Sequence, residues 1–161
     1  MSLSGSCLCG AIKYESSSKS LTAPPVFPVA ARETNAECYN LEEPQVKALC
    51  HCTDCQKWTG GAFTSNAVVP ADGFKVVKGE PKTYDVTGDS GKNNRHFFCG
   101  TCGSGLYTKL DIMPDVVIIK AGGLDNGKAA LDGKVDVEFY CKDRVSYLSD
   151  QPGAKQTPAF S

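Results

Sequence analysis

The sequence has no apolar run that approaches the roughly 20 residues needed to cross a membrane, and its first residues lack the apolar core of a secretory signal. It also lacks an excess of charge, since 17 Lys and Arg face 18 Asp and Glu and the basic residues are scattered. Because a polyanion is bound by a concentrated basic patch, we expect no nucleic-acid partner and no membrane partner. We expect a cytoplasmic protein that binds a small molecule.

Internal repeats of the solenoid kind are absent as well. The length of 161 residues suits one domain, and a hydrophobic content of 41% is enough for a packed core. Sixteen Gly and nine Pro predict many turns and short strands rather than long helices. We predict one domain over residues 1–150 and a loose C-terminal tail over 151–161, where two Pro and a Gly occur.

Short stretches of alternating apolar and polar residues predict strands along most of the chain. Residues 16–47 lack this alternation, and their three Pro between Ala23 and Pro28 predict a long surface loop. Asp54 is expected to cap a short helical turn over 55–58. The continuous apolar run 116–119 is expected to be a strand buried on both faces. The predicted strands are 11–15, 62–69, 74–78, 95–99, 104–110, 116–119 and 135–139.

Nine cysteines are the most unusual feature of the composition. In a reducing cytosol clustered thiols bind metal more often than they form disulfides. Alternate residues of a strand point to one side, so a C-x-C pair can direct two sulfurs at one point, and a Gly-rich C-x-x-C turn does the same by curling. Seven cysteines form three such groups: Cys7 and Cys9; Cys50, Cys52 and Cys55; Cys99 and Cys102.

Zinc takes four protein ligands in a closed structural site and three in a site with an exchangeable position. The simplest partition is therefore a closed site from Cys7, Cys9, Cys99 and Cys102 and an open site from Cys50, Cys52 and Cys55. Two closed sites are the alternative, and they need an eighth ligand from Cys38, Cys141, His51 or His96. His51 is a poor candidate because strand geometry directs it away from Cys50 and Cys52. An iron–sulfur cluster is disfavoured because the spacings match neither ferredoxin pattern.

The cysteine groups and their neighbours resemble the family of glutathione-dependent formaldehyde-activating enzymes and centromere protein V. The matching motifs are GSCLCGAIKY from Gly5, CHCTDCQKWTG from Cys50 and FCGTCG from Phe98, and the later VEFYCKDR is similar to fungal members. The resemblance implies a mainly β fold, a β-tent of twisted antiparallel sheets stapled by zinc and related to zinc-ribbon scaffolds. It also implies two Zn²⁺ ions, a structural one on the four-cysteine set and a catalytic one on the three-cysteine set.

The activity implied by the resemblance is that of a carbon–sulfur lyase, with glutathione as substrate or co-substrate. Its reaction interconverts S-(hydroxymethyl)glutathione with glutathione and formaldehyde. The interval between Cys9 and Cys50 is longer than the family pattern. This 16–47 insertion could be a lid, a partner site or a passively tolerated loop, and its Cys38 could close the second zinc site.

Three thiolates leave a divalent zinc with a net charge of −1, which weakens its Lewis acidity and suits exchange of a thiol ligand better than hydrolysis. We therefore hypothesise that a substrate thiol takes the open position. His96 is a candidate acid or base, or else a strand surface residue. Gln56 and Lys57 could contact the ligand or be exposed helix residues. Arg144 could hold a glutathione carboxylate or pair with an acidic residue.

The remaining side chains have simpler expected roles. Trp58 and Phe63 are expected to pack in the core, with a pocket wall as the alternative, and Cys141 is expected to be a small buried hydrophobe. Two other functions stay open. The chain could be a non-catalytic, zinc-stapled module that binds a protein through the insertion, or the scaffold could act on another sulfur-containing metabolite. Oligomeric state and true substrate are not predicted.

Overall fold

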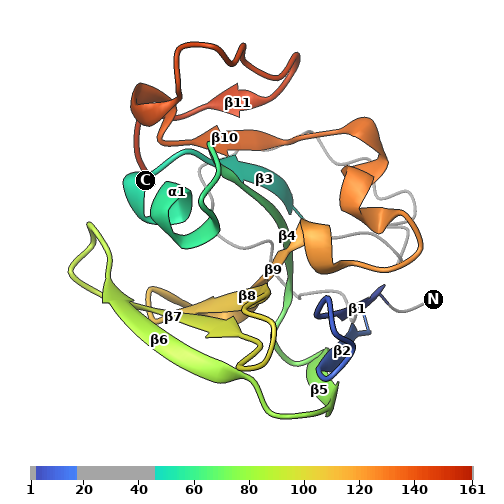
Figure 1. Ribbon diagram of the computed structural model, residues 1–161. Helices are drawn as coiled ribbons and strands as arrows, with labels where there is room; N and C mark the ends of the chain where they lie inside the picture. The colour runs from blue at the N-terminus through green and yellow to red at the C-terminus, as the bar shows by residue number, and fades with distance from the viewer. Residues whose placement is uncertain (1–2, 18–45, 161) are drawn as a thin grey trace.

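The computed structural model describes residues 3–17 and 46–160, and most of its regular structure is β strand (Figure 1). Cys38 and most of the predicted 16–47 loop lie outside these residues. At the two ends of the predicted loop the structure has strand, because Ser16 belongs to one strand and residues 46–47 belong to the next. The elements are β1 (Leu3–Ser6), β2 (Lys13–Ser16), β3 (Val46–Cys50), α1 (Thr53–Thr59), β4 (Thr64–Pro70), β5 (Phe74–Lys78), β6 (Lys82–Thr87), β7 (Asn93–Phe98), β8 (Gly105–Leu110), β9 (Met113–Lys120), β10 (Val137–Phe139) and β11 (Lys155–Gln156), with short 3₁₀ turns at Ala121–Gly123, Lys128–Gly133 and Cys141–Asp143.

Two sheets make up the fold. A small one has the order β1-β2-β5, and a large one has the order β11-β10-β3-β4-β9-β8-β7-β6. Neighbouring strands are antiparallel except around β10, which runs parallel to both β3 and β11. The prediction of a mainly β protein with twisted sheets is confirmed, with the difference that the large sheet is mixed. Among the described residues no helix is long and apolar enough to cross a membrane.

The two faces of the large sheet differ in character because side chains alternate along its strands. On β4, Ala67 and Val69 enter the main core. On the opposite face Thr64, Asn66 and Val68 are also buried. The run 116–119 on β9 is divided in the same way, so it is buried on both faces as expected except at Ile118, which stays partly accessible.

The large sheet curves strongly. In Figure 1, β10 and β11 lie above and β6 to β8 lie below, and α1 lies between them. The helix begins one residue earlier than Asp54 and its N-cap is Cys52, whose sulfur accepts a hydrogen bond from the backbone N–H of Cys55. The prediction that Asp54 is the cap is therefore wrong. Asp54 lies in the first turn, where its negative charge still favours the helix.

Four strands were not expected from the sequence, namely β1, β3, β6 and β11. β11 lies within residues 151–161, which were expected to be a loose tail. β11 pairs with β10, and the backbone N–H of Thr157 donates to the Glu138 carbonyl at 2.9 Å. Phe160 then packs on Phe139, with ring centroids 5.0 Å apart. A two-residue strand is too short for periodicity to reveal it, whereas its hydrogen bonds to β10 hold the segment in place.

Candidate metal centres

The four cysteines of the first set converge from two turns that lie 90 residues apart in the sequence. Each pair is followed by a glycine in the left-handed conformation, Gly10 at φ 69° and Gly103 at φ 73°. In both turns this glycine's N–H donates back to the carbonyl of the pair's first cysteine, at 2.9 Å. A residue without Cβ adopts this conformation at no steric cost, so the two glycines allow the chain to curl around its sulfurs.

The sulfur positions fit a tetrahedral zinc ion. The Sγ atoms of Cys7, Cys9, Cys99 and Cys102 all lie within 4.8 Å of one another. The Cys7–Cys9 sulfurs are 3.5 Å apart and the Cys9–Cys99 sulfurs 3.8 Å, where four ligands at about 2.3 Å from zinc would be about 3.8 Å apart. Backbone N–H groups of Ile12 and Thr101 point at two of these sulfurs, as expected where thiolates are stabilised.

The second set comes from one continuous segment. Cys50 ends β3, Cys52 caps α1 and Cys55 lies in its first turn, so a strand end followed at once by a helix start turns three thiols toward one point. Their Sγ atoms also lie within 4.8 Å of one another, and all three residues are only partly buried. Hydrogen bonds from Cys50 and Cys52 hold the pKa of Cys55 well below its usual range, and the same contacts raise the pKa of Cys50. The donor set suits a soft divalent metal such as zinc.

A cavity of about 260 Å³ opens beside this second set. All three cysteines contribute to its wall, together with side chains from one face of the large sheet. Across the opening, the β6–β7 turn approaches β10, because Tyr140 hydrogen-bonds to Asp89. Burial and this carboxylate raise the pKa of Tyr140. Tyr140 itself has a φ of 57°, a left-handed backbone conformation that a bulky residue rarely adopts.

A chain of hydrogen bonds links Cys55 to a lysine of the same cavity. The Thr64 hydroxyl donates to Cys55 Sγ at 3.2 Å, Asn66 Nδ2 donates to Thr64 Oγ1 at 2.9 Å, and Asn66 Oδ1 accepts from Lys120 Nζ at 2.9 Å. Every donor in this chain points toward the sulfur. The sheet register produces the arrangement, since Thr64 pairs with Cys50 and Asn66 with Lys120. Burial lowers the pKa of Lys120, while the nearby thiols oppose this shift.

His96 lines the same cavity and is only 7% exposed, so its interpretation as a strand surface residue is wrong. Its ring stacks on Trp58 of α1, with centroids 4.7 Å apart, and its Nδ1 lies 3.0 Å from Thr108 Oγ1. Burial lowers the pKa of His96, with a further contribution from the charge of Lys120. The imidazole is therefore neutral at neutral pH. The structure places this predicted acid or base in the cavity with the three thiols.

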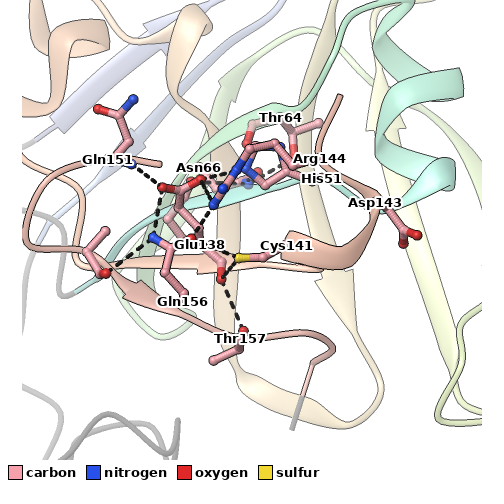
Figure 2. Close-up of polar contacts among 12 residues, drawn as sticks. His51, Thr64, Asn66, Glu138, Cys141, Asp143, Arg144, Gln151, Gln156 and Thr157 are labelled. Carbon is pink, nitrogen blue, oxygen red and sulfur yellow. Dashed lines mark hydrogen bonds and ion pairs between the residues drawn. The ribbon is translucent and has the colours of Figure 1, made fainter. Parts of the chain in front are cut away.

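His51 points away from the thiols, as its place between Cys50 and Cys52 predicts. It is buried, and its Nε2 lies 2.7 Å from Glu138 Oε2 on the adjacent strand β10. Figure 2 shows Glu138 at the centre of a network that also includes Arg144, Gln156 and the backbone of Gln151. Burial alone would raise the pKa of Glu138, but these hydrogen bonds and the Arg144 charge lower it to about 2.

The residues predicted to bind substrate lie outside the cavity wall. Arg144 donates to Glu138 at 3.0 Å, the acidic pairing that was the alternative to a glutathione carboxylate. Gln56 Nε2 donates to the backbone carbonyls of His51 and Asp143 and so fixes α1 against the chain beyond β10. Lys57 is exposed on the last turn of the helix. None of the three is among the lining residues of the described structure.

Two cysteines belong to neither of the groups seen in the sequence, Cys38 and Cys141. Cys141 is only partly buried, and its thiol donates to the Glu138 carbonyl at 3.2 Å and to Gln156 Oε1 at 3.1 Å. The expectation of a small buried hydrophobe is therefore wrong, because this thiol has polar partners. Cys38 lies outside the described residues, so the structure does not bear on its proposed role as a further ligand.

Comparison with known proteins places this geometry in a family. A family profile described as "Glutathione-dependent formaldehyde-activating enzyme" matches residues 32–143, which include the second cysteine set and Cys99 and Cys102. No curated protein matches the chain. Among solved structures, the crystal structure of a Rhodobacter sphaeroides protein matches with a TM-score of 0.53 and 19% identity, over 82% of this chain and 96% of that one. At this identity the likeness concerns the fold alone.

Proposed function

Because the chain belongs to the glutathione-dependent formaldehyde-activating enzyme family, we propose that it is a zinc-dependent carbon–sulfur lyase acting in the cytoplasm on a thiol adduct. The adduct is one of glutathione or another small thiol, such as S-(hydroxymethyl)glutathione. In this proposal Cys7, Cys9, Cys99 and Cys102 hold a structural zinc, whereas Cys50, Cys52 and Cys55 hold a second zinc with one position left for substrate.

The observation that carries the proposal is the place of the second cysteine set in the wall of a cavity. A purely structural site needs no access to small molecules, and four protein ligands would enclose its metal. Zinc held by the three thiolates would supply Lewis acidity that lowers the pKa of a bound thiol. The other requirements of the reaction fall to side chains of the same cavity.

Those side chains must first hold the thiolates in place. The Thr64 hydroxyl, itself fixed by Asn66, keeps one lone pair of Cys55 Sγ occupied and orients the sulfur. Outer hydrogen bonds of this kind tune ligands at metal sites, and their loss typically costs about 10- to 100-fold in affinity or activity. The Lys120 ammonium at the end of the chain offsets the negative charge of the thiolates.

A proton must also move during the reaction. When the adduct breaks, its carbon–sulfur bond is cleaved, its hydroxyl group loses a proton to become the carbonyl of formaldehyde, and the sulfur gains a proton. The addition of a thiol to formaldehyde makes the same changes in reverse. The neutral ring of His96 is the cavity group suited to hold the proton given up by the adduct oxygen, and the Lys120 ammonium is the group suited to supply the proton that the sulfur gains. His96 is stacked on Trp58 and bonded through Nδ1, so its orientation is fixed.

The test is the rate at which the purified, zinc-loaded chain exchanges formaldehyde with its S-hydroxymethyl adducts, followed by exchange NMR. Glutathione and 2-mercaptoethanol serve as the two thiols. We expect acceleration with at least one of them, lost in Cys52→Ser and kept in Cys141→Ser, which changes a thiol outside both sets. If neither thiol exchanges faster than in buffer, the lyase proposal is wrong and a non-catalytic, zinc-stapled binding module becomes the better account.

A further inference from the structure

The cavity has two chemically different ends. Near the thiols its floor is polar, with Asn66 on β4 opposite Lys120 on β9. The next pair on the same face, two residues further along each strand, is Val68 and Ile118. Val68 and Ile118 are apolar, and Leu110, Ile112, Phe139 and Phe160 add further apolar surface to the cavity wall, with the hydroxyl of Thr108 beside Ile118. A molecule with its sulfur at the thiols would therefore lay its remaining atoms on hydrocarbon.

The charges of the cavity favour the same kind of molecule. Within the described part of the chain, the cationic residues of the wall are Lys120 and Lys142. Lys120 is bonded to Asn66 at 2.9 Å, and Lys142 is paired with Asp143 at 2.8 Å. Asp54 and Asp89 also line the wall. The wall thus has three carboxylates, those of Asp54, Asp89 and Asp143, and three thiolates against two ammonium groups. Its net charge stays negative even when a divalent metal is bound.

Glutathione is poorly matched to this wall. It carries two carboxylates and one ammonium, and each carboxylate loses solvation on entering a cavity unless it finds a cationic partner. The cations predicted for that role do not line the cavity, since Arg144 is bonded to Glu138 and Lys57 faces solvent. Val68, Ile118 and the other apolar side chains of the described wall offer no hydrogen bonds to a peptide backbone, and the Thr108 hydroxyl is already bonded to His96. An uncharged thiol with a hydrocarbon group avoids each of these costs.

We propose that the cavity selects an uncharged thiol adduct with an apolar substituent, held with its sulfur at Cys50, Cys52 and Cys55 and its hydrocarbon over Val68 and Ile118, and that it disfavours glutathione. The inference rests on the proposed function for the place of the sulfur and narrows its substrate class. The bond changes are those already described, with the apolar group unchanged by the reaction.

Binding can be measured without turnover. Trp58 is the single tryptophan of the chain and stacks on His96 in the cavity wall, so its fluorescence reports on occupancy. Titration of the zinc-loaded chain with benzyl mercaptan is expected to give a dissociation constant at least about tenfold lower than titration with glutathione, the discrimination an apolar pocket gives for a small hydrocarbon group. Adding formaldehyde then measures exchange of each adduct.

Two matched variants locate the selectivity. Ile112 in the cavity wall and Val77 on β5, outside it, are equally exposed at 45% and 46%. Ile112→Lys is expected to weaken benzyl mercaptan about tenfold and to strengthen glutathione up to about fivefold. Val77→Lys is expected to change neither, which controls for the added charge.

The outcomes separate this inference from the lyase proposal. The substrate class is wrong if glutathione binds as tightly as benzyl mercaptan or more tightly, or if Ile112→Lys and Val77→Lys have equal effects. In that case exchange activity with glutathione would still support the lyase proposal. Selective binding of benzyl mercaptan without exchange of any adduct supports the substrate class and overturns the lyase. Binding of neither thiol overturns the substrate class.

Discussion

The two cysteine sets have the same kind of ligand and opposite surroundings. The four-cysteine set joins a turn at residues 7–10 to a turn at residues 99–103, and two of its members, Cys7 and Cys99, are buried. The three-cysteine set comes from one short segment, has no fully buried member and borders a cavity. A cross-link between distant segments constrains the fold, whereas a local set at a cavity leaves the fold nearly independent of its metal.

Their supporting contacts differ in the same direction. Around the four-cysteine set the partners are mainly backbone N–H groups of its own turns. Around the three-cysteine set one backbone N–H, that of Cys55, is joined by a chain of sheet side chains, Thr64, Asn66 and Lys120, aligned by strand register. Turn backbone fixes geometry, while polar side chains at a cavity also contribute charge and protons. From this comparison we expect the first set to contribute mainly to stability and the second mainly to chemistry.

The largest expected difference comes from removing one ligand of each set. Cys102→Ser should lose a zinc and several kcal/mol of unfolding free energy, because a structural zinc contributes directly to folding. Cys52→Ser should lose the other zinc and the exchange activity but keep the fold. Zinc content, circular dichroism and urea unfolding measure this. If the two variants are equally destabilised, the division between the sets is wrong.

A smaller effect is expected at Glu138 on β10. Its carboxylate contacts His51, whose side chain points away from the second cysteine set. Glu138→Gln should cost about 3 kcal/mol of unfolding free energy, since it removes the carboxylate of a buried residue that is paired with the partly buried Arg144. The folded pKa of about 2 lies below the ordinary value of 4.5. The carboxylate therefore stabilises the fold fully above pH about 4.5, and this contribution disappears as pH falls toward 2.

The measurement is the difference in urea unfolding between the wild type and Glu138→Gln at pH 7, 4.5 and 3. Metal loss in acid affects both proteins and cancels in the difference. A difference that stays constant across this range would show that packing, not the charge of Glu138, holds β10 against His51.

The smallest of these effects concerns the hydrogen-bond chain and changes activity rather than stability. Lys120→Met should lower the exchange rate about 100-fold, the lower end of what positioned proton donors contribute. Lys142→Met is the matched control, because this lysine also lines the cavity but pairs with Asp143. If both variants lose the same amount of exchange activity, Lys120 contributes only its positive charge and not a specific position in the hydrogen-bond chain.

Most of the correct predictions came from the spacing of residues that are close together in the sequence. The grouping of both cysteine sets and the orientation of His51 could be predicted from residues that are close in the sequence, although Cys7 and Cys9 lie in a turn and Cys52 caps a helix rather than lying on strands as expected. Lys120 and Asn66 could not be found in this way, because their contact depends on the register between β4 and β9, more than fifty residues apart. Glu138 looked like the polar face of an ordinary alternating strand. Its burial arises because β11 and Arg144 cover it.

His96 was misjudged for a related reason. It follows three polar residues on β7 that give no sign of burial, and Trp58 on α1 stacks on the ring. Whether one face of a strand meets solvent is decided by the element placed over it. That placement is a property of the whole fold, so a single sequence gives little signal for it.

The attachment of β11 to β10 has a consequence for how the protein is made. Cys50, Cys52 and Cys55 leave the ribosome early, but the strand beside them, β10, is the neighbour of β11, which is synthesised about a hundred residues later. Glu138, which binds His51 between these cysteines, acquires its contacts with Gln151 and Gln156 only then. The full set of contacts that holds His51 in place therefore forms only after β11 has been synthesised.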